Sequence, residues 1–405
     1  MAWVVRGEFR KLWVGQLVSA SGSAITTVAL PLVAVLTLHA SAVEMGVLAA
    51  LTAVPHLVFG LPAGVGVDRW SLRRVLVLTD VGRAVLLGSI PVAAAAGALR
   101  MWQLYVVAVL TGVLTLLSET AAMTLMPALA PRDDLIRANS AHLLNLNVAS
   151  TAGPSLAGLL VQLMTAPFAI LFDAASYVVS GVASYLIREP RRELAERSEV
   201  RLTDGLRTIF GSPVLAPLAV SATVGAIAGS LQGPLIVLYL VRELHWTPAL
   251  VGVAITVFGA AAIVGSLLAP AWIRLLGIGR GYITGQLIAS LTGAALAVGL
   301  APFVLLGQAL SGLGMSLFAV PQRTLRQSLV PPTALAQGTA TWRTLVIGGQ
   351  SLGALTSGLL ATTIGLRPTL LLSTTTTLAA TLIATLSPLR TLHGLPGLVD
   401  AGHGN

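Results

Sequence analysis

Apolar windows bounded by charges, proline and glycine follow one another along the whole chain. Each has about the 20 mostly apolar residues that a helix needs to cross a hydrocarbon core of roughly 30 Å. The pattern predicts an all-α fold class, a polytopic membrane protein with twelve transmembrane helices. The expected spans are residues 12–38, 44–66, 75–98, 102–127, 139–163 and 166–187, then 214–241, 248–272, 281–300, 302–325, 338–363 and 366–388.

One long charged stretch separates the sixth and seventh predicted spans, and it divides the chain into two halves. We expect its residues to form a partly helical linker along the membrane surface, with Leu194, Leu202, Leu206 and Ile209 toward the lipid. The expected domains are an N-terminal six-helix bundle at 1–187, a cytoplasmic linker at 188–213, a C-terminal six-helix bundle at 214–390 and a cytoplasmic tail at 391–405.

The two halves are related by a repeat with an offset of 200 residues. The shift aligns residues 129–135 with 329–335, and it aligns residues 153–160 with 353–360, without a gap. Two matches at one offset indicate a parallel duplication of six plus six spans. In such a design, the substrate path is expected between the halves, near the middle of the bilayer.

The composition agrees with lipid as the main solvent. Of the 405 residues, 55% are hydrophobic and 10% are charged, which a water-facing domain of this size does not tolerate. The absence of cysteine excludes a disulfide framework and a catalytic cysteine. Lys11 is the only lysine, so the phosphate-binding loop of a nucleotide-driven pump cannot exist. With no metal-ligand cluster or paired catalytic carboxylates, we expect no metal, no cofactor and no enzymatic activity.

The basic residues predict the orientation in the membrane. Segments between alternate spans are rich in arginine, whereas the intervening ones carry only Arg100, Arg242 and Arg367. By the positive-inside rule, both termini and the linker are cytoplasmic in a multi-pass protein of the cell membrane. The net charge of +9 is therefore explained by topology and anionic lipid headgroups, and we expect no nucleic-acid partner.

The segment after the second predicted span resembles the loop motif of the major facilitator superfamily. It has a glycine, then Asp-Arg, then a basic pair, formed here by Gly64, Asp68, Arg69, Arg73 and Arg74. The resemblance implies that Asp68 lies near the start of span 11, where a helix N-terminus favours negative charge. The motif would then be a conformational latch between the halves. The alternative is that these arginines only set the topology.

Span 5 contains a second family-like motif. Gly153, Pro154 and Gly158 resemble the Gly-Pro-x-x-Gly-Gly antiporter motif of drug exporters, with Ala157 in place of one glycine. Together with residues 12–19, 131–139 and 173–177, it resembles the exporter branch that contains the enterobactin exporter and macrolide efflux proteins. The resemblance implies a monomer that exports small molecules. This chain departs from the branch at Gly22-Ser23, where relatives often carry Gly-Asp.

Ionisable side chains inside spans are costly and indicate a partner, a watery cavity or a function. We expect Arg83 to pair with Glu119, with Asp80 closer to the surface, either as a structural charge cluster or with Glu119 as a proton site. Asp173 is expected to be structural, bonded to Ser176 or to a neighbouring span. The candidates for proton coupling or the charge cluster are Asp80, Arg83, Glu119, Asp173 and His56. No span after Asp173 contains a carboxylate, so coupling through carboxylates would use the first half.

Uncharged polar residues in the spans are candidates for lining a substrate cavity. Serine and threonine can also donate hydrogen bonds to their own helix backbone, so most of these residues can have no role in transport. The scarcity of buried charge favours an amphipathic substrate. The candidates are Ser19, Ser23, Thr26, Thr27, Asn145, Gln232 and Gln322.

The leading interpretation is a secondary active transporter that exports a small amphipathic molecule, such as a drug, natural product or siderophore. Proton antiport would drive it by alternating access, with the substrate, protons and membrane lipids as partners. A transporter for proton-independent uptake or facilitated diffusion is an alternative, which Ser23 favours. A non-transporting receptor or scaffold is a further alternative, against which the repeat and the loop motif argue. An intramembrane hydrolase lacks any supporting catalytic residues.

Overall fold

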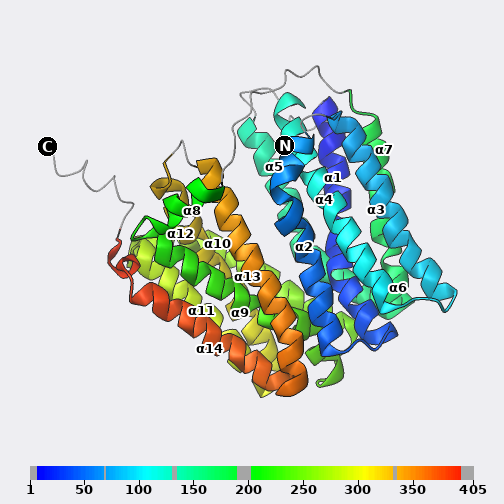
Figure 1. Cartoon of the computed structure of the whole chain (residues 1–405). Coiled ribbons are helices and arrows are strands. Elements are labelled where there is room, and N and C mark those ends of the chain that lie inside the picture. Colours follow the sequence, from blue (N-terminus) through cyan, green and yellow to red (C-terminus); the bar gives the residue numbers. More distant parts are fainter. Residues whose placement is uncertain (1–6, 68–69, 130–134, 189–201, 332–334, 394–405) are drawn as a thin grey trace. The chain divides into compact units, whose positions relative to one another are not determined.

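The computed structural model describes residues 7–67, 70–129, 135–188, 202–331 and 335–393, which form helices and no strand (Figure 1). Eleven helices among the described residues are long and apolar enough to cross a membrane. Val148–Met164, within a longer helix, is a shorter apolar segment that accounts for the remaining predicted span. The all-α, polytopic fold class with twelve transmembrane helices is therefore confirmed.

The chain divides into two compact units. The first unit contains Met1–Arg197 and Leu240–Thr256, and the second contains Ser198–Tyr239 and Val257–Asn405. The segment Leu240–Thr256, from the second half of the sequence, thus packs with the first unit.

The first unit is a bundle in which α1 packs against α5 and α7, α3 packs against α4 and α7, and α2 packs against α4. Serine and glycine on α1 let it approach its neighbours closely. The helices are α1 (Glu8–Leu32), continued by the π-helical η1 (Val33–Thr37), α2 (Ala42–Val67), α3 (Leu72–Ala95), α4 (Met101–Leu129), α5 (Leu135–Met164), α6 (Ala166–Ala169) and α7 (Leu171–Tyr185).

The sixth predicted span is broken into the short helix α6 and the longer helix α7. Thr165 precedes α6 with a positive φ of 74°. The break at Ile170 places Asp173 in the first turn of α7, where the backbone amide of Asp173 donates to the carbonyl of Ile170 at 3.0 Å. The start of a helix carries a partial positive charge, which favours an acidic side chain at this position.

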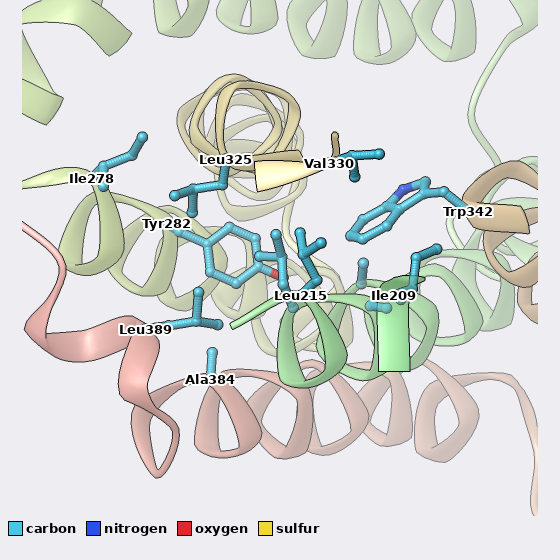
Figure 2. Close-up of a cluster of buried hydrophobic side chains, with 12 residues drawn as sticks. Ile209, Leu215, Ile278, Tyr282, Leu325, Val330, Trp342, Ala384 and Leu389 are labelled. Atoms are coloured by element: carbon cyan, nitrogen blue, oxygen red, sulfur yellow. The ribbon is translucent and has the colours of Figure 1, made fainter. Parts of the chain in front are cut away.

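The second unit has an apolar core that also includes the linker helix. Figure 2 shows Ile209 of α8 beside Trp342, with Leu215 and Tyr282 in the same buried cluster. The helices are α8 (Leu202–Phe210), α9 (Leu215–Arg242), α10 (Pro248–Leu276), α11 (Ile278–Val298), α12 (Ala301–Leu329), α13 (Leu335–Thr363), α14 (Leu366–Thr385) and the 3₁₀ helix η4 (Pro388–Thr391).

The linker helix α8 packs against α13, which corrects one expectation. Ile209 was expected to face the lipid, but its side chain is fully buried in the cluster, because the helix turns one apolar side toward α13. Leu206 is exposed, as expected. Leu194 lies outside the described residues.

The repeat is visible in the packing of equivalent glycines. A methyl group at Gly153 of α5 would clash with Ala24 of α1, and one at Gly353 of α13 would clash with Ile227 of α9. These glycines are related by the 200-residue offset. In each unit, therefore, the fifth span approaches the first span closely at the same register, where a side chain would separate the two backbones.

Candidate functional site

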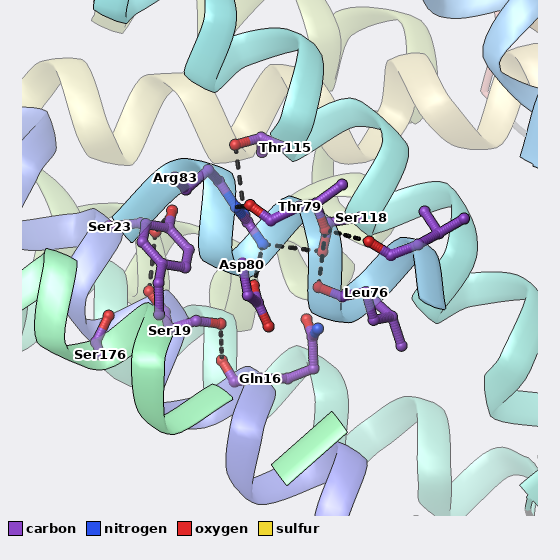
Figure 3. Close-up of polar contacts among 12 residues, drawn as sticks. Gln16, Ser19, Ser23, Leu76, Thr79, Asp80, Arg83, Thr115, Ser118 and Ser176 are labelled. Carbon is purple, nitrogen blue, oxygen red and sulfur yellow. Dashed lines mark hydrogen bonds and ion pairs between the residues drawn. The ribbon is translucent and has the colours of Figure 1, made fainter. Parts of the chain in front are cut away.

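A buried ion pair lies on α3, in the interior of the first unit. The guanidinium of Arg83 donates to Oδ1 of Asp80, one turn earlier on the same helix (Figure 3). Asp80 is 1% exposed and Arg83 is 5% exposed. Because removing either partner would leave an uncompensated charge in an apolar bundle, the pair is a strong structural constraint.

Arg83 has further partners on α4 and α7. Its Nη2 atom donates to Oγ of Ser118 at 3.0 Å, and its Nη1 atom donates to Oγ1 of Thr115 at 3.5 Å. The guanidinium carbon lies 4.1 Å from the centre of the Tyr177 ring, a cation–π contact. Arg83 thus links three helices of the bundle.

The predicted pair between Arg83 and Glu119 is wrong. Glu119 is exposed, whereas Thr115 and Ser118 face Arg83 from α4. Residues three apart share a helix face, but the next residue is rotated by about 100°. The polar pair Thr115 and Ser118 was the signal in the sequence for the face of α4 that meets α3.

Asp173 is a second buried carboxylate, 1% exposed, at the start of α7. Ser176 donates its hydroxyl to Oδ1 of Asp173 at 3.1 Å and to the backbone carbonyl of the same residue at 2.8 Å. A methyl group at Gly22 of α1 would lie 2.6 Å from Oδ1 of Asp173 and would clash with Ser176. The bond from Asp173 to Ser176 therefore forms as expected, directly against α1.

A hydroxyl pair joins α1 to α7 beside this carboxylate. Oγ of Ser23 lies 2.7 Å from the hydroxyl of Tyr177, which follows Asp173 by one turn. The buried hydroxyl of Thr26 on α1 also lies near the carboxylate of Asp173. Figure 3 shows half-buried Ser23 and buried Arg83 among these polar side chains. We call Ser23, Asp80, Arg83, Asp173 and Tyr177 the polar network.

Most of the other candidate cavity residues bond within or between helices. Thr27 donates to the carbonyl of Ser23 at 2.8 Å, and Ser19 donates to the carbonyl of Gln16 at 3.3 Å. Asn145 of α5 is buried and donates to the carbonyl of Trp13 of α1 at 3.2 Å. Gln232 of α9, Gln322 of α12 and His56 of α2 are half-buried.

The predicted latch is only partly described. Asp68 and Arg69 lie outside the described residues, and Gly64 falls near the end of α2. The guanidinium of Arg73 lies 5.6 Å from the centre of the Tyr185 ring, and Arg74 is exposed. Arg73 therefore contacts the end of α7 in its own unit.

A contact at the ends of α1 and α7 was not predicted. Lys11 pairs with Glu8 at 2.8 Å and donates to the carbonyl of Leu186 at 2.7 Å. Glu8 also accepts from the backbone amide of Arg188 at 2.7 Å. The spacing of Glu8 and Lys11 was the signal in the sequence, but the partner at the end of α7 is 175 residues away along the chain.

The antiporter-like motif packs against the start of α10, within the first unit. Gly158 and Gly252 face each other, because a methyl group at either one would lie 3.1 to 3.2 Å from the Cα atom of the other. Pro154 is buried, and its carbonyl also faces Gly252. One turn away, Ser155 and Thr256 share a hydrogen bond of 2.7 Å. Gly252 and Thr256 were not among the predicted site residues.

The second unit contains an uncharged polar cluster. Ser221 of α9 lies 3.0 Å from the hydroxyl of Tyr282 and donates to Oε1 of Gln286 at 3.2 Å, both on α11. It also donates to the carbonyl of Ala380 at 2.8 Å. Ser373, which the 200-residue offset aligns with Asp173, is a buried serine. The carboxylates buried in the described spans are thus those of the first unit.

The chain matches the family described as transmembrane secretion effector over residues 1–396. It is 29% identical over 226 residues to the multidrug efflux pump Tap of Mycolicibacterium fortuitum, a region that covers 53% of the chain and 55% of that pump. The chain thus spans about half the length of that relative. Macrolide efflux protein A of Streptococcus pyogenes is 22% identical over 383 residues, which cover 91% of the chain and 93% of that protein.

Solved transporter structures share the fold. The nucleoside transporter NupG has a TM-score of 0.76 at 13% identity, and the match covers 94% of this chain and 98% of that transporter. A bacterial homologue of the iron transporter ferroportin, in an inward-facing state, has a TM-score of 0.75 at 17% identity, with 93% and 97% covered. With the family match over nearly the whole chain, the conclusion is that this protein belongs to the transmembrane secretion effector family and is a membrane transporter of the major facilitator superfamily.

Proposed function

We propose that the protein exports a small amphipathic molecule, such as a drug, natural product or siderophore, in exchange for protons. The observation that carries the proposal is the polar network, which holds two buried carboxylates, Asp80 and Asp173, but one cation, Arg83. Alternating access of the two halves would connect this network to one side of the membrane at a time.

The charge balance of the network supports proton exchange. One guanidinium compensates one carboxylate, so the second ionised carboxylate would stand uncompensated in an apolar bundle. That situation costs several kcal/mol, and a carboxylate relieves it by binding a proton. The start of α7 stabilises the ionised form of Asp173 by a smaller amount, which offsets part of that cost. A group with two accessible protonation states is what an antiporter requires.

The direction and the substrate class are inferred from the relatives and from the charge distribution. The relatives include a multidrug efflux pump and a macrolide efflux protein, which favours export of bulky amphipathic compounds. The cluster around Ser221 in the second unit is uncharged, so it offers no ion pair for a highly charged substrate. We place the protein in the cell membrane as a monomer with both termini in the cytoplasm, in line with its arginine distribution.

Transport into inverted membrane vesicles tests the proposal. Vesicles containing the protein are energised with a proton gradient, and uptake of erythromycin, tetracycline and ethidium is measured together with the internal pH. Uptake that dissipates the gradient is expected for at least one compound. Uptake without proton movement would establish facilitated diffusion, and movement of no compound in a broad panel would support the receptor or scaffold alternative.

A further inference from the structure

We propose that Asp173 is the residue that carries the proton, and that Arg83 is a counter-ion shared between Asp80 and Asp173. This inference rests on the proposed exchange of substrate for protons. In the described state, Arg83 is paired with Asp80, and Asp173 would hold the proton. When Asp173 releases the proton, Arg83 turns toward it.

Arg83 contacts both of the helices that carry the two carboxylates. Asp80 lies one turn before Arg83 on α3, and the Tyr177 ring under the guanidinium lies one turn after Asp173 on α7. A flat guanidinium can rotate over an aromatic ring and keep its cation–π contact. The hydroxyls of Ser118 and Thr115 would hold the group during this movement.

The surroundings of Asp173 distinguish it from Asp80. Asp80 has a direct ion pair, whereas the carboxylate of Asp173 lies beside neutral hydroxyls, those of Ser176 and Thr26. The ionisable groups that lie near Asp173 are Arg83 on α3 and Tyr177 on α7, and Asp80 of α3 lies near Tyr177. The facing residues of α1 are uncharged, and α6 contains no ionisable residue. Among these groups, Arg83 is the one cation that can stabilise ionised Asp173.

The same geometry places Asp173 directly against α1. The carboxylate of Asp173 lies against Gly22, the residue before Ser23. Ser23 instead bonds to Tyr177. An acid at position 23 would compete with Asp173 for the same space and the same arginine.

The proposed cycle conserves charge and protons. Asp173 takes up one proton on a carboxylate oxygen from the outside, and Arg83 then pairs with Asp80. After the change of access, the proton leaves Asp173 toward the cytoplasm, and Arg83 is then shared between the ionised carboxylates of Asp173 and Asp80. No covalent bond other than that to the proton forms or breaks.

Two transport measurements distinguish a failure of this inference from a failure of the proposed function. In proteoliposomes, Asp173→Asn should lose proton-driven erythromycin accumulation, and it should retain counterflow exchange of erythromycin, which needs no net proton movement. Glu119→Gln, which alters an exposed carboxylate, should retain both modes. Unchanged proton-driven accumulation in Asp173→Asn would overturn the inference. Absence of proton movement in the wild-type protein would instead overturn the proposed function.

A measurement on the wild-type protein covers the case in which the variant does not fold. Dicyclohexylcarbodiimide modifies protonated carboxyl groups in apolar surroundings, and the modified residue can be mapped by mass spectrometry. We expect modification of Asp173, reduced at high pH and by erythromycin, with Asp80 unmodified. An adduct on Asp80 or Glu119 in place of Asp173 would overturn the inference.

Discussion

The guanidinium of Arg83 lies 4.1 Å from the centre of the Tyr177 ring, so a cation of α3 rests on an aromatic side chain of α7. The contact connects the ion pair with Asp80 to the helix that carries Asp173. Both side chains are buried, and a guanidinium–aromatic contact gains strength where water is excluded. Arg83 therefore couples α3 and α7 electrostatically, and substitutions at this contact should change the stability of the protein.

The ion pair of α3 should dominate the stability of the first unit. Arg83→Gln leaves Asp80 buried without its cation, and breaking a buried pair costs about 3–5 kcal/mol. We expect a clear drop in the thermal unfolding midpoint in lipid nanodiscs. Asp80→Asn combined with Arg83→Gln should recover part of the loss, because no unpaired charge remains. Arg74→Gln, at an exposed position of α3, should leave the midpoint unchanged. Equal effects at positions 74 and 83 would contradict the prediction.

The hydroxyl pair between α1 and α7 should be worth about 0.5–1.5 kcal/mol. Tyr177→Phe removes the bond to Ser23 but keeps the ring under Arg83. Ser23→Ala removes the same bond from the other side. Ser23→Ala also removes the bond of 2.8 Å to the carbonyl of Ser19. Because both changes delete the shared bond between the hydroxyls, the double variant should lose less stability than the sum of the single variants. If the stability losses of the two single variants add up strictly in the double variant, the two hydroxyls are not coupled.

Gly22 should not tolerate a methyl group. Gly22→Ala would place a carbon 2.6 Å from Oδ1 of Asp173 and would clash with Ser176, so α1 and α7 must separate. Overpacking of this kind costs about 1–3 kcal/mol. The matched control is Gly88→Ala on α3, where a methyl group meets no atom within 4 Å. Thermal unfolding and proton-driven uptake should fall in the first variant and stay near wild type in the second.

The contact between Gly158 and Gly252 should be needed for transport. An alanine at either position would push apart two helix backbones, because each Cα atom lies 3.1 to 3.2 Å from the added methyl of the other. We expect Gly158→Ala and Gly252→Ala to insert normally and to lose erythromycin export in whole cells. Gly229→Ala on α9, which meets no atom within 4 Å, is the control. Full export by both α5 and α10 variants would show that this close approach is dispensable.

The orientation can be tested directly because the chain contains no cysteine. Arg100→Cys and Arg390→Cys both introduce a thiol at an exposed position. In spheroplasts, a membrane-impermeant maleimide should label position 100 without permeabilisation and position 390 only after it. The wild-type protein gives the background. Labelling of position 390 in intact spheroplasts would contradict the positive-inside assignment.

The sequence by itself determined the number of spans, the repeat and the half that holds the buried carboxylates. These properties are local, because each span must satisfy its own backbone hydrogen bonds and carry enough apolar residues for lipid. Asp80, Arg83 and Asp173 could be found in this way, since a charged residue within an apolar window is conspicuous without knowledge of its neighbours. The family-like motifs around Gly64 and Gly153 also indicated the superfamily to which the chain belongs.

The tertiary structure alone decided the partners. Arg83 pairs with Asp80 and not with Glu119, because the packing of α3 on α4 turns Ser118 inward and Glu119 outward. Asp173 meets Gly22 because α7 packs against α1, although the two residues are far apart along the chain. A helix has several faces that can accept polar side chains, and only the packing of the bundle selects which one is buried. The partner of each charge is therefore a property of the fold.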